Sequence, residues 1–573
     1  MLLIRFFVFS ILFYSSLDEF PKDTTMFISP LRIPQLLSAN FGELRIDHYH
    51  SGLDFKTQGV TGKEVVASAD GYIYRINITP GGFGKAMYIK HDYGYSTVYA
   101  HLDSFTPEIE EYVKTRQYEK KSFMVVLFPS KNEFPVKQGE LIAYSGNSGS
   151  SGGPHLHFEI RRSDSERPLN PLLYEFGTVD KIKPVIEKLA IYPVNHNTLI
   201  NNRNSIKKIN VSGSHGIYSI PEENEITISG PAGFGIKAYD LLNDSYNRCA
   251  LYSIELVIDS TSIFKYSMDG FSFNESRYVN SHIDYETYMK ENIYIERTFV
   301  LPFDKLSVYD HVIDRGIFNF NDDKTHHAEI IVTDAYSNKS SLSFKIKAHR
   351  VKAATGTGLT DANIKIMPYN RSNKFSSENI LLSIPSGALY DTLNFSYKKE
   401  KGTGEMLSDL HYVHNKFTPV HKSYTLSLKP TTIPAGKESK MLIVQLKDDQ
   451  SRSAFNGTWD NGYLSSDVMS FGRFYVGIDT IPPQISGNGL IPGANFNGKK
   501  AIRIRVTDDF SGIRSYEPEI DGKWALFEYD QKNSLLIYEF DSKRITKGTN
   551  HNLSLKVTDN KDNVSFYNYS FVW

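Results

Sequence analysis

The run Gly153-Pro-His155-Leu-His157-Phe-Glu159 predicts a β-strand, because apolar residues alternate with polar ones and Ile160 continues the pattern. Side chains two positions apart on a strand point to the same face, so both histidines face one site, about 7 Å apart along the strand. This arrangement suits one histidine that binds a metal ion and a neighbour that handles the water on that ion. An HxH pair is a weak signal when it stands alone, so the rest of the site must come from elsewhere in the chain.

Two upstream motifs supply the missing residue types. His50-Ser-Gly-Leu-Asp54 provides a histidine and a carboxylate four residues apart, and His101 lies at the end of an apolar, aromatic strand. Hydrolytic zinc sites typically use three nitrogen or oxygen ligands and leave a fourth position for water. His50, Asp54 and one strand histidine form such a set, and His101 and the other histidine remain to position or deprotonate the water. The residues alone leave two alternatives open: His101 as a core histidine and Asp54 as a turn residue.

Residues 41–175 resemble the lysostaphin/LytM-type zinc metallopeptidases, peptidase family M23. The resemblance rests on eight runs in the family's order: Phe41-Gly-Glu43, His50-Ser-Gly-Leu-Asp54, Val65-Val-Ala-Ser-Ala-Asp-Gly71, Tyr99-Ala-His-Leu102, Lys137-Gln-Gly-Glu140, Ser145-Gly-Asn-Ser-Gly149, Gly153-Pro-His-Leu-His-Phe-Glu159 and Asn170-Pro171. It implies a compact antiparallel β-fold with an open groove and one Zn²⁺ per chain. It also implies that the zinc ligands are His50, Asp54 and His157, and that His101 and His155 are the catalytic histidines. All five positions carry the expected residue type, whereas relatives that have lost ligands act as non-catalytic activators.

Two features depart from the family's pattern. His48 forms a second HxH pair with His50, and the HxGxD spacing favours His50 as the ligand, with His48 near the site or on the surface. Residues 104–135 form an insertion where the family usually has a short turn. We expect this insertion to contribute to the wall of the cleft.

The composition excludes several classes of protein. With 40% hydrophobic and 13% aromatic residues, the 573-residue chain can bury cores, and its 36 tyrosines and 36 phenylalanines favour β-structure. The 64 Lys and Arg residues balance 65 Asp and Glu residues, so there is no basic field to bind nucleic acid or an anionic membrane. The single cysteine, Cys249, cannot form an internal disulfide and is interpreted as a buried small side chain.

The first residues resemble a secretory signal peptide. A short charged start, Met1-Leu-Leu-Ile-Arg5, precedes an apolar run from Phe6 to Tyr14 that is too short for an ordinary membrane-spanning helix. We therefore expect residues 1–21 to be a signal peptide or a retained N-terminal anchor, and the mature chain to have no membrane-spanning segment. The predicted location is outside the cytoplasm, either in the periplasm or cell envelope or secreted.

The sequence beyond residue 178 contains an internal repeat. Four landmarks recur in the same order: Asp180-Lys-Ile-Lys-Pro-Val-Ile186 with Asp479-Thr-Ile-Pro-Pro-Gln-Ile485, Ile236-Lys-Ala-Tyr-Asp240 with Ile504-Arg-Val-Thr-Asp508, Ile258-Asp259 with Ile520-Asp521, and Val332-Thr-Asp-Ala-Tyr-Ser-Asn338 with Val557-Thr-Asp-Asn-Lys-Asp-Asn563. This order implies two copies of one module. Short alternating strands between turn signals favour an immunoglobulin-like (Ig-like) β-sandwich for each copy.

The predicted fold is therefore all-β, with an antiparallel LytM-type metallopeptidase domain followed by three β-sandwich domains. The expected segments are 1–21 (signal peptide or anchor), 22–178 (metallopeptidase domain), 179–350 (an Ig-like sandwich with an insertion near 264–325), 351–478 (a third sandwich) and 479–573 (a compact Ig-like sandwich).

No cluster of metal-binding residues is recognisable from spacing in the three sandwiches. His326 and His327 are adjacent, so on a strand they face opposite sides and cannot readily share a metal ion. Two acidic pairs, Asp322-Asp323 and Asp508-Asp509, lack the spacing of a calcium loop and are interpreted as solvated turns.

Four functions are compatible with these observations. The leading one is an exported zinc endopeptidase that hydrolyses peptide cross-links of bacterial peptidoglycan, with envelope proteins as further partners. The alternatives are a secreted zinc protease acting on glycine-rich extracellular proteins, a non-catalytic cell-wall binding or activator protein, and an adhesion or assembly protein. A further hypothesis is that the sandwiches dock back across the groove and restrain the enzyme.

Overall fold

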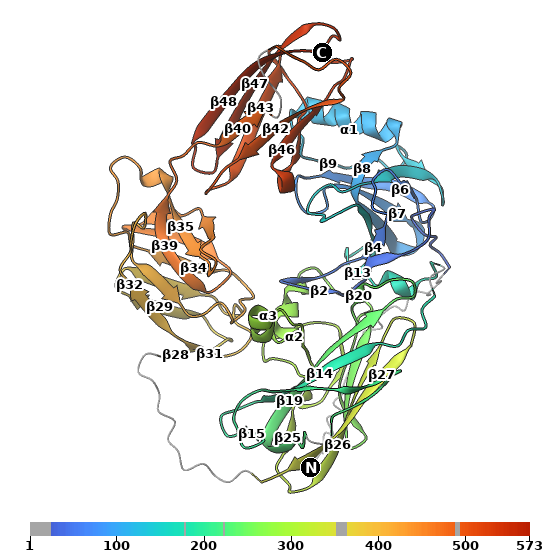
Figure 1. The fold of residues 1–573 in the computed structure, drawn as a ribbon, viewed down its shortest axis with the longest axis vertical. Helices are drawn as coiled ribbons and strands as arrows, with labels where there is room; N and C mark the ends of the chain where they lie inside the picture. The colour runs from blue at the N-terminus through green and yellow to red at the C-terminus, as the bar shows by residue number, and fades with distance from the viewer. Residues whose placement is uncertain (1–24, 177–178, 222–223, 351–363, 488–492) are drawn as a thin grey trace, which may run out of the picture.

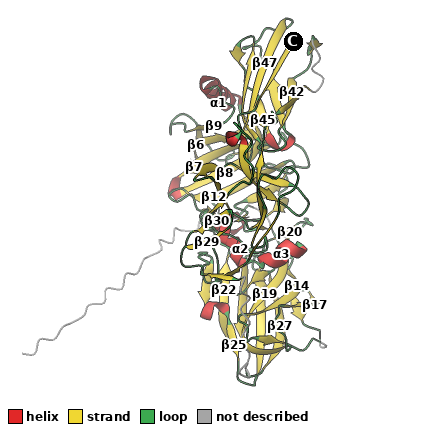
Figure 2. Cartoon of the chain, turned by 90° about the vertical axis from the view of Figure 1, so that its left-hand side faces the viewer, coloured by secondary structure: helices red, strands yellow, loops and turns green. Residues whose placement is uncertain are grey.

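The computed structural model describes residues 25–176, 179–221, 224–350, 364–487 and 493–573, so the predicted signal peptide lies outside the described residues. Strands dominate the structure (Figure 2), which confirms the all-β prediction. The helices are α1 (Pro107–Lys120), α2 (Val279–His282) and α3 (Tyr285–Glu291), with short 3-10 turns η1 (Asp92–Gly94), η2 (Pro171–Leu173), η3 (Ser276–Tyr278), η4 (Asp314–Gly316), η5 (Glu438–Lys440) and η6 (Gln531–Asn533). Within the described ranges, no helix has the length and apolar character needed to cross a membrane.

The first region, residues 25–176, is built around one antiparallel sheet in the order β1-β4-β12-β8-β7-β6-β10, with β9, β11 and β13 paired to its members and β5 paired to β11. Its strands are β1 (Leu37–Ala39), β4 (Leu53–Lys56), β5 (Glu64–Val66), β6 (Gly71–Ile78), β7 (Lys85–His91), β8 (Tyr95–Phe105), β9 (Val125–Leu127), β10 (Pro135–Val136), β11 (Leu141–Ser145), β12 (His155–Arg162) and β13 (Pro168–Leu169). A separate hairpin is formed by β2 (Leu44–Arg45) and β3 (His48–Tyr49).

Strand register brings the three sequence motifs together. The predicted strand is β12, which lies between β4 and β8, and its His157 pairs with Asp54 on one side and with Ala100 on the other. Gly52 allows this pairing, since a Cβ at that position would lie 2.3 Å from the main-chain oxygen of Phe158.

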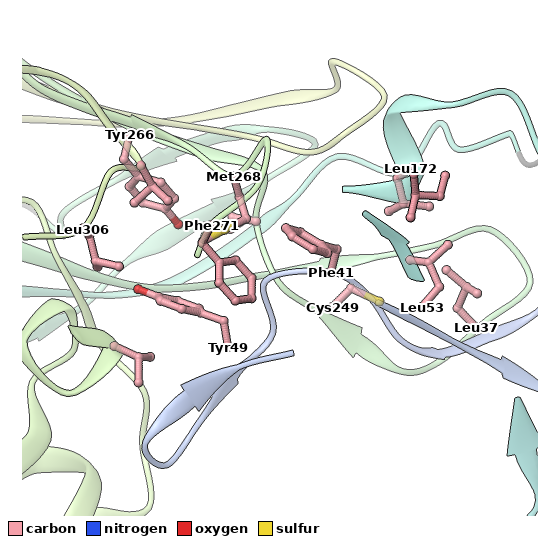
Figure 3. Packing of buried hydrophobic residues seen from close by; sticks show 14 of the residues in the cluster. Leu37, Phe41, Tyr49, Leu53, Leu172, Cys249, Tyr266, Met268, Phe271 and Leu306 are labelled. Atoms are coloured by element: carbon pink, nitrogen blue, oxygen red, sulfur yellow. The ribbon is translucent and has the colours of Figure 1, made fainter. Parts of the chain in front are cut away.

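The first repeat copy, residues 180–349, shares its core with the first region. Its strands are β14 (Val185–Pro193), β15 (Leu199–Ile200), β16 (Lys207–Asn210), β17 (Ser212–Ser214), β18 (Ile217–Ser219), β19 (Thr227–Leu241), β20 (Arg248–Cys249), β21 (Ser253–Ile258), β22 (Thr261–Ser267), β23 (Glu296–Arg297), β24 (Tyr309–Val312), β25 (Phe318–Phe320), β26 (Thr325–Thr333) and β27 (Lys339–Ala348). At the junction, Phe41 and Tyr49 pack on Phe271, with ring centroids 5.2 and 5.4 Å apart (Figure 3). Cys249 is buried in the same cluster, as expected.

The middle region, residues 364–478, pairs two five-stranded sheets around its own core. Its strands are β28 (Lys365–Met367), β29 (Asn373–Ser377), β30 (Ile380–Ile384), β31 (Leu393–Phe395), β32 (Tyr397–Glu400), β33 (Leu410–Val413), β34 (Tyr424–Leu428), β35 (Met441–Leu446), β36 (Arg452–Phe455), β37 (Thr458–Asp460), β38 (Tyr463–Val468) and β39 (Gly472–Ile478).

The second repeat copy, residues 479–573, has a four-stranded and a five-stranded sheet around a third core. Its strands are β40 (Gln484–Gly487), β41 (Ala494–Asn495), β42 (Ala501–Thr507), β43 (Ile513–Ile520), β44 (Lys523–Trp524), β45 (Glu528–Asp530), β46 (Leu535–Glu539), β47 (Asn550–Asp559) and β48 (Val564–Val572).

The four regions form a closed loop, and the second copy returns to the first region beside α1 (Figure 1). Helix α1 lies within the predicted insertion 104–135 and forms much of this contact. The ring of Tyr118 meets Trp524 edge-on at 5.1 Å, and Glu111 forms an ion pair with Lys543 at 3.0 Å. The insertion therefore carries a docking surface for the second copy.

Candidate metal centre

Three side chains converge at the end of β12. His50 Nε2 lies 3.0 Å from both Asp54 Oδ1 and His157 Nδ1, and the last two atoms are 2.9 Å apart. All three residues are buried. The register of β4 and β12 fixes two of the three, and His50 is delivered by the turn between β3 and β4.

The partners of the two rings determine which ring nitrogens are free. His50 Nδ1 donates to the main-chain oxygen of Asn40 at 2.7 Å, because a carbonyl can only accept. His157 Nε2 lies 2.9 Å from the Glu159 carboxylate, which likewise accepts. In the neutral histidines the lone pairs of Nε2 (His50) and Nδ1 (His157) therefore point at each other and at an Asp54 oxygen.

Three electron-rich atoms in this arrangement fit a cation. Ligands at about 2.0–2.1 Å from a tetrahedral zinc ion are ~3.3 Å apart, close to the separations found here. Burial alone would raise the pKa of Asp54, but the charge of His50 and hydrogen bonds from the histidines hold it well below its usual range. Burial would likewise lower the pKa of His157, yet bonds to Asp54 and Glu159 raise it to about 9. The donor set therefore suits one metal ion bound by His50, Asp54 and His157.

A buried ionic chain supports His157, and our sequence analysis missed it. Glu159 is fully buried and accepts from Ser51 Oγ at 2.5 Å and from Arg161 Nε. Burial would raise the pKa of Glu159, but the Arg161 charge and the bond from His157 lower it to about 2. The signal was present in the sequence: the period of two that aligns His155 with His157 also places Glu159 and Arg161 on that face.

Two further histidines flank the cluster without joining it. His155 Nδ1 lies 2.9 Å from the main-chain oxygen of Gly153, which leaves Nε2, 3.5 Å from Asp54 Oδ1, on the metal side. His101 Nδ1 donates to the main-chain oxygen of Ser148 at 2.9 Å. The two rings lie 4.8 Å apart. Both therefore keep Nε2 available to accept a proton, and burial with the nearby histidines lowers the pKa of His101 to about 3.

His101 also has a strained backbone, with φ of 59°, in the left-handed region that non-glycine residues rarely adopt. Such strain persists only where surrounding contacts hold it in place. Here the His101 amide donates to the oxygen of Phe83, and its ring is fixed by Ser148.

The first repeat copy holds the loop that carries His50. The Asn40 side chain donates to the oxygen of Ala250 at 2.9 Å and accepts from the Ala250 amide at 2.7 Å. The main-chain oxygen of Asn40 binds His50 Nδ1, so Ala250, 210 positions from Asn40, helps to orient a candidate ligand. Ser276 and Asn280 add hydrogen bonds to Tyr49 and Asp47 in the adjoining hairpin.

The second repeat copy holds the loop behind the other two histidines. Lys532 Nζ donates to the main-chain oxygen of Asn147, to its Oδ1 at 2.9 Å and to the oxygen of Ser151 at 2.8 Å. Ser151 Oγ lies 3.1 Å from His155 Nδ1, and Ser148, in the same loop, binds His101. A second contact is the ion pair of Lys85 with Glu528 at 2.8 Å.

The remaining histidines and acids singled out in the sequence lie elsewhere. His48 is exposed and its Nδ1 lies 3.0 Å from the oxygen of Ile46, outside the cluster. His326 is buried and His327 is exposed, so the two face opposite sides as predicted. Asp322 accepts from the Lys324 amide and lies 3.0 Å from His326 Nε2.

The described residues of the sandwiches contain two acidic clusters that sequence spacing did not reveal. In the first copy, Asp180, Asp240 and Asp334 meet, and in the second copy the equivalent acids are Asp479, Asp508 and Asp559. Asp508 therefore belongs to a cluster and is not part of a freely solvated turn. Spacing could not reveal this, because each acid comes from a different strand end.

Comparisons with known proteins agree with the geometry. Residues 48–118 and 129–171 match the model of peptidase family M23, and residues 364–479 match that of a Zu5-like domain. The break in the first match lies inside the insertion at 104–135. The DD-carboxypeptidase/endopeptidase Mpg of Neisseria meningitidis serogroup B is 35% identical over 123 residues, 22% of this chain and 22% of that protein.

Two further proteins show similar matches. The murein hydrolase activator NlpD of Escherichia coli is 30% identical over 125 residues, which cover 22% of this chain and 26% of that protein. A solved zinc-containing peptidase from Vibrio cholerae is 27% identical over 24% of this chain and 36% of its own, with a TM-score of 0.18. The matches thus span from about a fifth to about a third of each relative's length.

Proposed function

Because the chain contains a peptidase family M23 domain, we propose that it is an exported zinc endopeptidase that hydrolyses peptide cross-links of bacterial peptidoglycan. The observation that carries the proposal is the convergence of three ligand atoms, from His50, Asp54 and His157, beside two histidines whose Nε2 atoms remain available. The names of two relatives, an endopeptidase and a murein hydrolase activator, support a substrate in the cell wall.

Each residue has a role that follows from its contacts. Zinc, when bound, would lower the pKa of a water molecule and polarise a carbonyl oxygen. His155 is oriented through Nδ1 and can accept a proton at Nε2, which it then delivers to the leaving amine. His101 is neutral and presents Nε2 as an acceptor, so it can position the attacking water by accepting a hydrogen bond from it. Glu159 fixes the ring of His157 and raises its basicity.

A non-catalytic activator is the second candidate, and the similarity to NlpD is the observation that favours it. The intact set of five residues favours the enzyme. A secreted protease that acts on glycine-rich proteins would use the same chemistry and differ only in substrate.

The test is digestion of purified peptidoglycan by the full chain, with products identified by mass spectrometry and zinc measured by elemental analysis. The variant is His157→Ala, and the matched control is His48→Ala, an exposed histidine from the other HxH pair. We expect wild type and the control to bind one zinc per chain and to remove cross-linked dimers, and His157→Ala to do neither.

The outcomes separate the candidates. Zinc binding without cleavage by wild type would replace the proposal with a protein substrate or an activator role, which stimulation of a separate amidase would reveal. If the wild-type protein neither binds zinc nor cleaves peptidoglycan, the domain acts as a non-catalytic scaffold.

A further inference from the structure

The landmarks that define the internal repeat meet in space. In the first copy Asp180 precedes β14, Asp240 lies near the end of β19 and Asp334 follows β26. One carboxylate oxygen from each lies within 4.8 Å of the others, and all three residues are buried. The acids are separated by 60 and 94 positions (240 − 180 and 334 − 240), so only the strand arrangement brings them together.

Two of these carboxylates have an oxygen without a partner. Asp180 Oδ2 and Asp240 Oδ1 accept no hydrogen bond from any residue that the structure describes. Asp240 is 1% exposed and Asp180 is 7% exposed, so neither oxygen is freely hydrated. A buried carboxylate without a counter-charge is strongly unfavourable, and here three share one site. Burial, Asp334 and Asp180 together raise the pKa of Asp240 to about 8.

The second copy provides an internal comparison, because its framework matches bond for bond. Asn338 Nδ2 donates to Asp334 Oδ2 at 2.7 Å and to the oxygen of Asp180 at 3.2 Å. Asn563 Nδ2 repeats both bonds with Asp559 and Asp479 at the same two distances. The strand register is also repeated: Val185 pairs with Tyr239, and the equivalent Gln484 pairs with Thr507.

The two clusters differ in how their oxygens are satisfied. In the second copy Asp508 Oδ1 accepts from the amides of Phe510 and Gly512. Asp479 uses both oxygens, with Oδ1 bonded to the amide of Ile481 and Oδ2 to the amide of Ser511. None of the three second-copy acids has an unpartnered buried oxygen among the described residues. In the first copy main-chain amides also bind Asp180 Oδ1 and Asp334 Oδ1, but no described group donates to Asp180 Oδ2 or Asp240 Oδ1. The clusters therefore differ at these two oxygens, whose counterparts in the second copy are satisfied or not buried.

The second copy also has nearby positive charge. Lys561 is buried, donates to the oxygen of Met441 at 2.7 Å, and is attracted by Asp479 and Asp559. Tyr336 occupies the equivalent position in the first copy. The strongest charged influences on Asp240 are the two other carboxylates of its own cluster.

We propose that Asp180, Asp240 and Asp334 form a calcium site that the second copy does not share. Calcium prefers oxygen ligands, takes six to eight of them and accepts irregular geometry. Three carboxylates supply oxygen donors without nitrogen or sulfur, which distinguishes this set from the His-Asp-His cluster. A bound ion would tie the segment that enters β14 to the ends of β19 and β26.

Calcium binding should be measured on the full chain loaded with zinc and dialysed into metal-depleted buffer. Equilibrium dialysis with radioactive calcium should give one calcium per chain in wild type and in Asp508→Asn, and none in Asp240→Asn. A parallel experiment with magnesium should give weaker binding. These measurements need no peptidase activity, so they stand apart from the test of the proposed function.

Thermal unfolding at pH 8 distinguishes loss of a ligand from damage to the fold. Calcium should raise the Tm of wild type and leave that of Asp240→Asn unchanged. Without calcium, Asp240→Asn should melt above wild type, because it removes repulsion between carboxylates. A structural role alone predicts that this variant melts lower.

Several results would overturn the proposal. Wild type that binds neither ion at millimolar concentration would mean that the cluster holds a proton instead. Preferential binding of magnesium would reject calcium, and two ions per chain would reject the distinction between the copies. If Asp240→Asn does not fold, calcium binding by Asp180→Asn and the number of calcium ions bound per wild-type chain test the proposal instead.

Discussion

The two repeat copies contact the same first region from different sides and by different means. The first copy shares a continuous apolar core with it and anchors Asn40, behind His50. The second copy has its own core and makes a smaller contact: Leu526 is buried in the first region's apolar cluster, Trp524 packs against that cluster, and Lys532 donates to Asn147. The first copy thus shares a continuous core with the candidate metal centre, whereas the second copy supports the loop beside His101 and His155.

This difference changes how the centre should be tested. Removing the first copy would expose Phe41 and Tyr49 and release the loop that carries His50. A fragment of residues 22–178 is therefore unsuitable for testing whether the sandwiches restrain activity. Point variants at the two interfaces, made in the full chain, test the comparison directly.

The largest effect should come from the apolar junction. Phe271→Ala removes a fully buried ring that packs on Phe41 and Tyr49, and should cost about 3–5 kcal/mol of unfolding free energy. The matched change in the second copy, Trp524→Ala, should cost only about 1 kcal/mol because that ring is part exposed. Urea unfolding of both variants checks the difference. Equal losses would show that the second copy is as integral as the first.

The next effect concerns the metal. Asn40→Ala keeps the main-chain oxygen that binds His50 but loses both bonds to Ala250, so zinc affinity should fall by about 10- to 100-fold. Competition with a chromogenic chelator measures this affinity. Asn280→Ala, which removes two hydrogen bonds to Asp47 at the same interface, should leave the zinc affinity nearly unchanged. A similar fall in zinc affinity in both variants would mean that the position of the whole β2–β3 hairpin, and not Asn40 alone, determines zinc binding.

A smaller effect is expected at the second copy. Lys532→Ala releases the loop whose Ser148 and Ser151 contact His101 and His155, so kcat should fall several-fold with zinc affinity unchanged. Lys543→Ala, which breaks an exposed ion pair with Glu111, should have no measurable effect. Steady-state cleavage of a soluble cross-linked peptide provides the measurement. A rise in kcat for Lys532→Ala would instead support restraint by the sandwiches, the hypothesis drawn from the sequence.

The last prediction concerns the pH dependence of the stability of the middle region, which links the two copies. Burial lowers the pKa of His411, in the middle region that links the copies, to about 4. Its folded pKa lies below the unfolded value of about 6.5, so its contribution to stability is complete above pH 6.5 and is lost as the pH falls toward 4. The loss is at most about 1.4 kcal/mol per pH unit. Calorimetry between pH 7.5 and 5 should show a middle-region transition that moves down in temperature, less so in His411→Gln; equal shifts in both proteins would contradict the assignment.

Much of the centre was predictable because its motifs are local. The alternation around His157 gave β12, and the spacing of His50 and Asp54 gave two partners whose positions follow from strand register. The resemblance to family M23 is confirmed by the family match, and the all-β class by the sheets.

What sequence could not provide was long-range pairing. Ala250, Lys532 and the three first-copy acids act through residues that are distant in the chain, and no periodicity encodes which strand ends will meet. Glu159 is different, since its alternation with His157 was visible and its importance appears only once burial removes it from solvent.

The bonds from Lys532 to Asn147 join residues 385 positions apart. During synthesis, Lys532 is therefore added long after the loop beside His101 and His155 has been made. Contacts between residues so far apart in the chain also form late in folding. A chain interrupted before residue 532 could fold its first region and still lack that support. Under the proposed function, full activity would therefore be reached only after the second copy has been made, folded and docked.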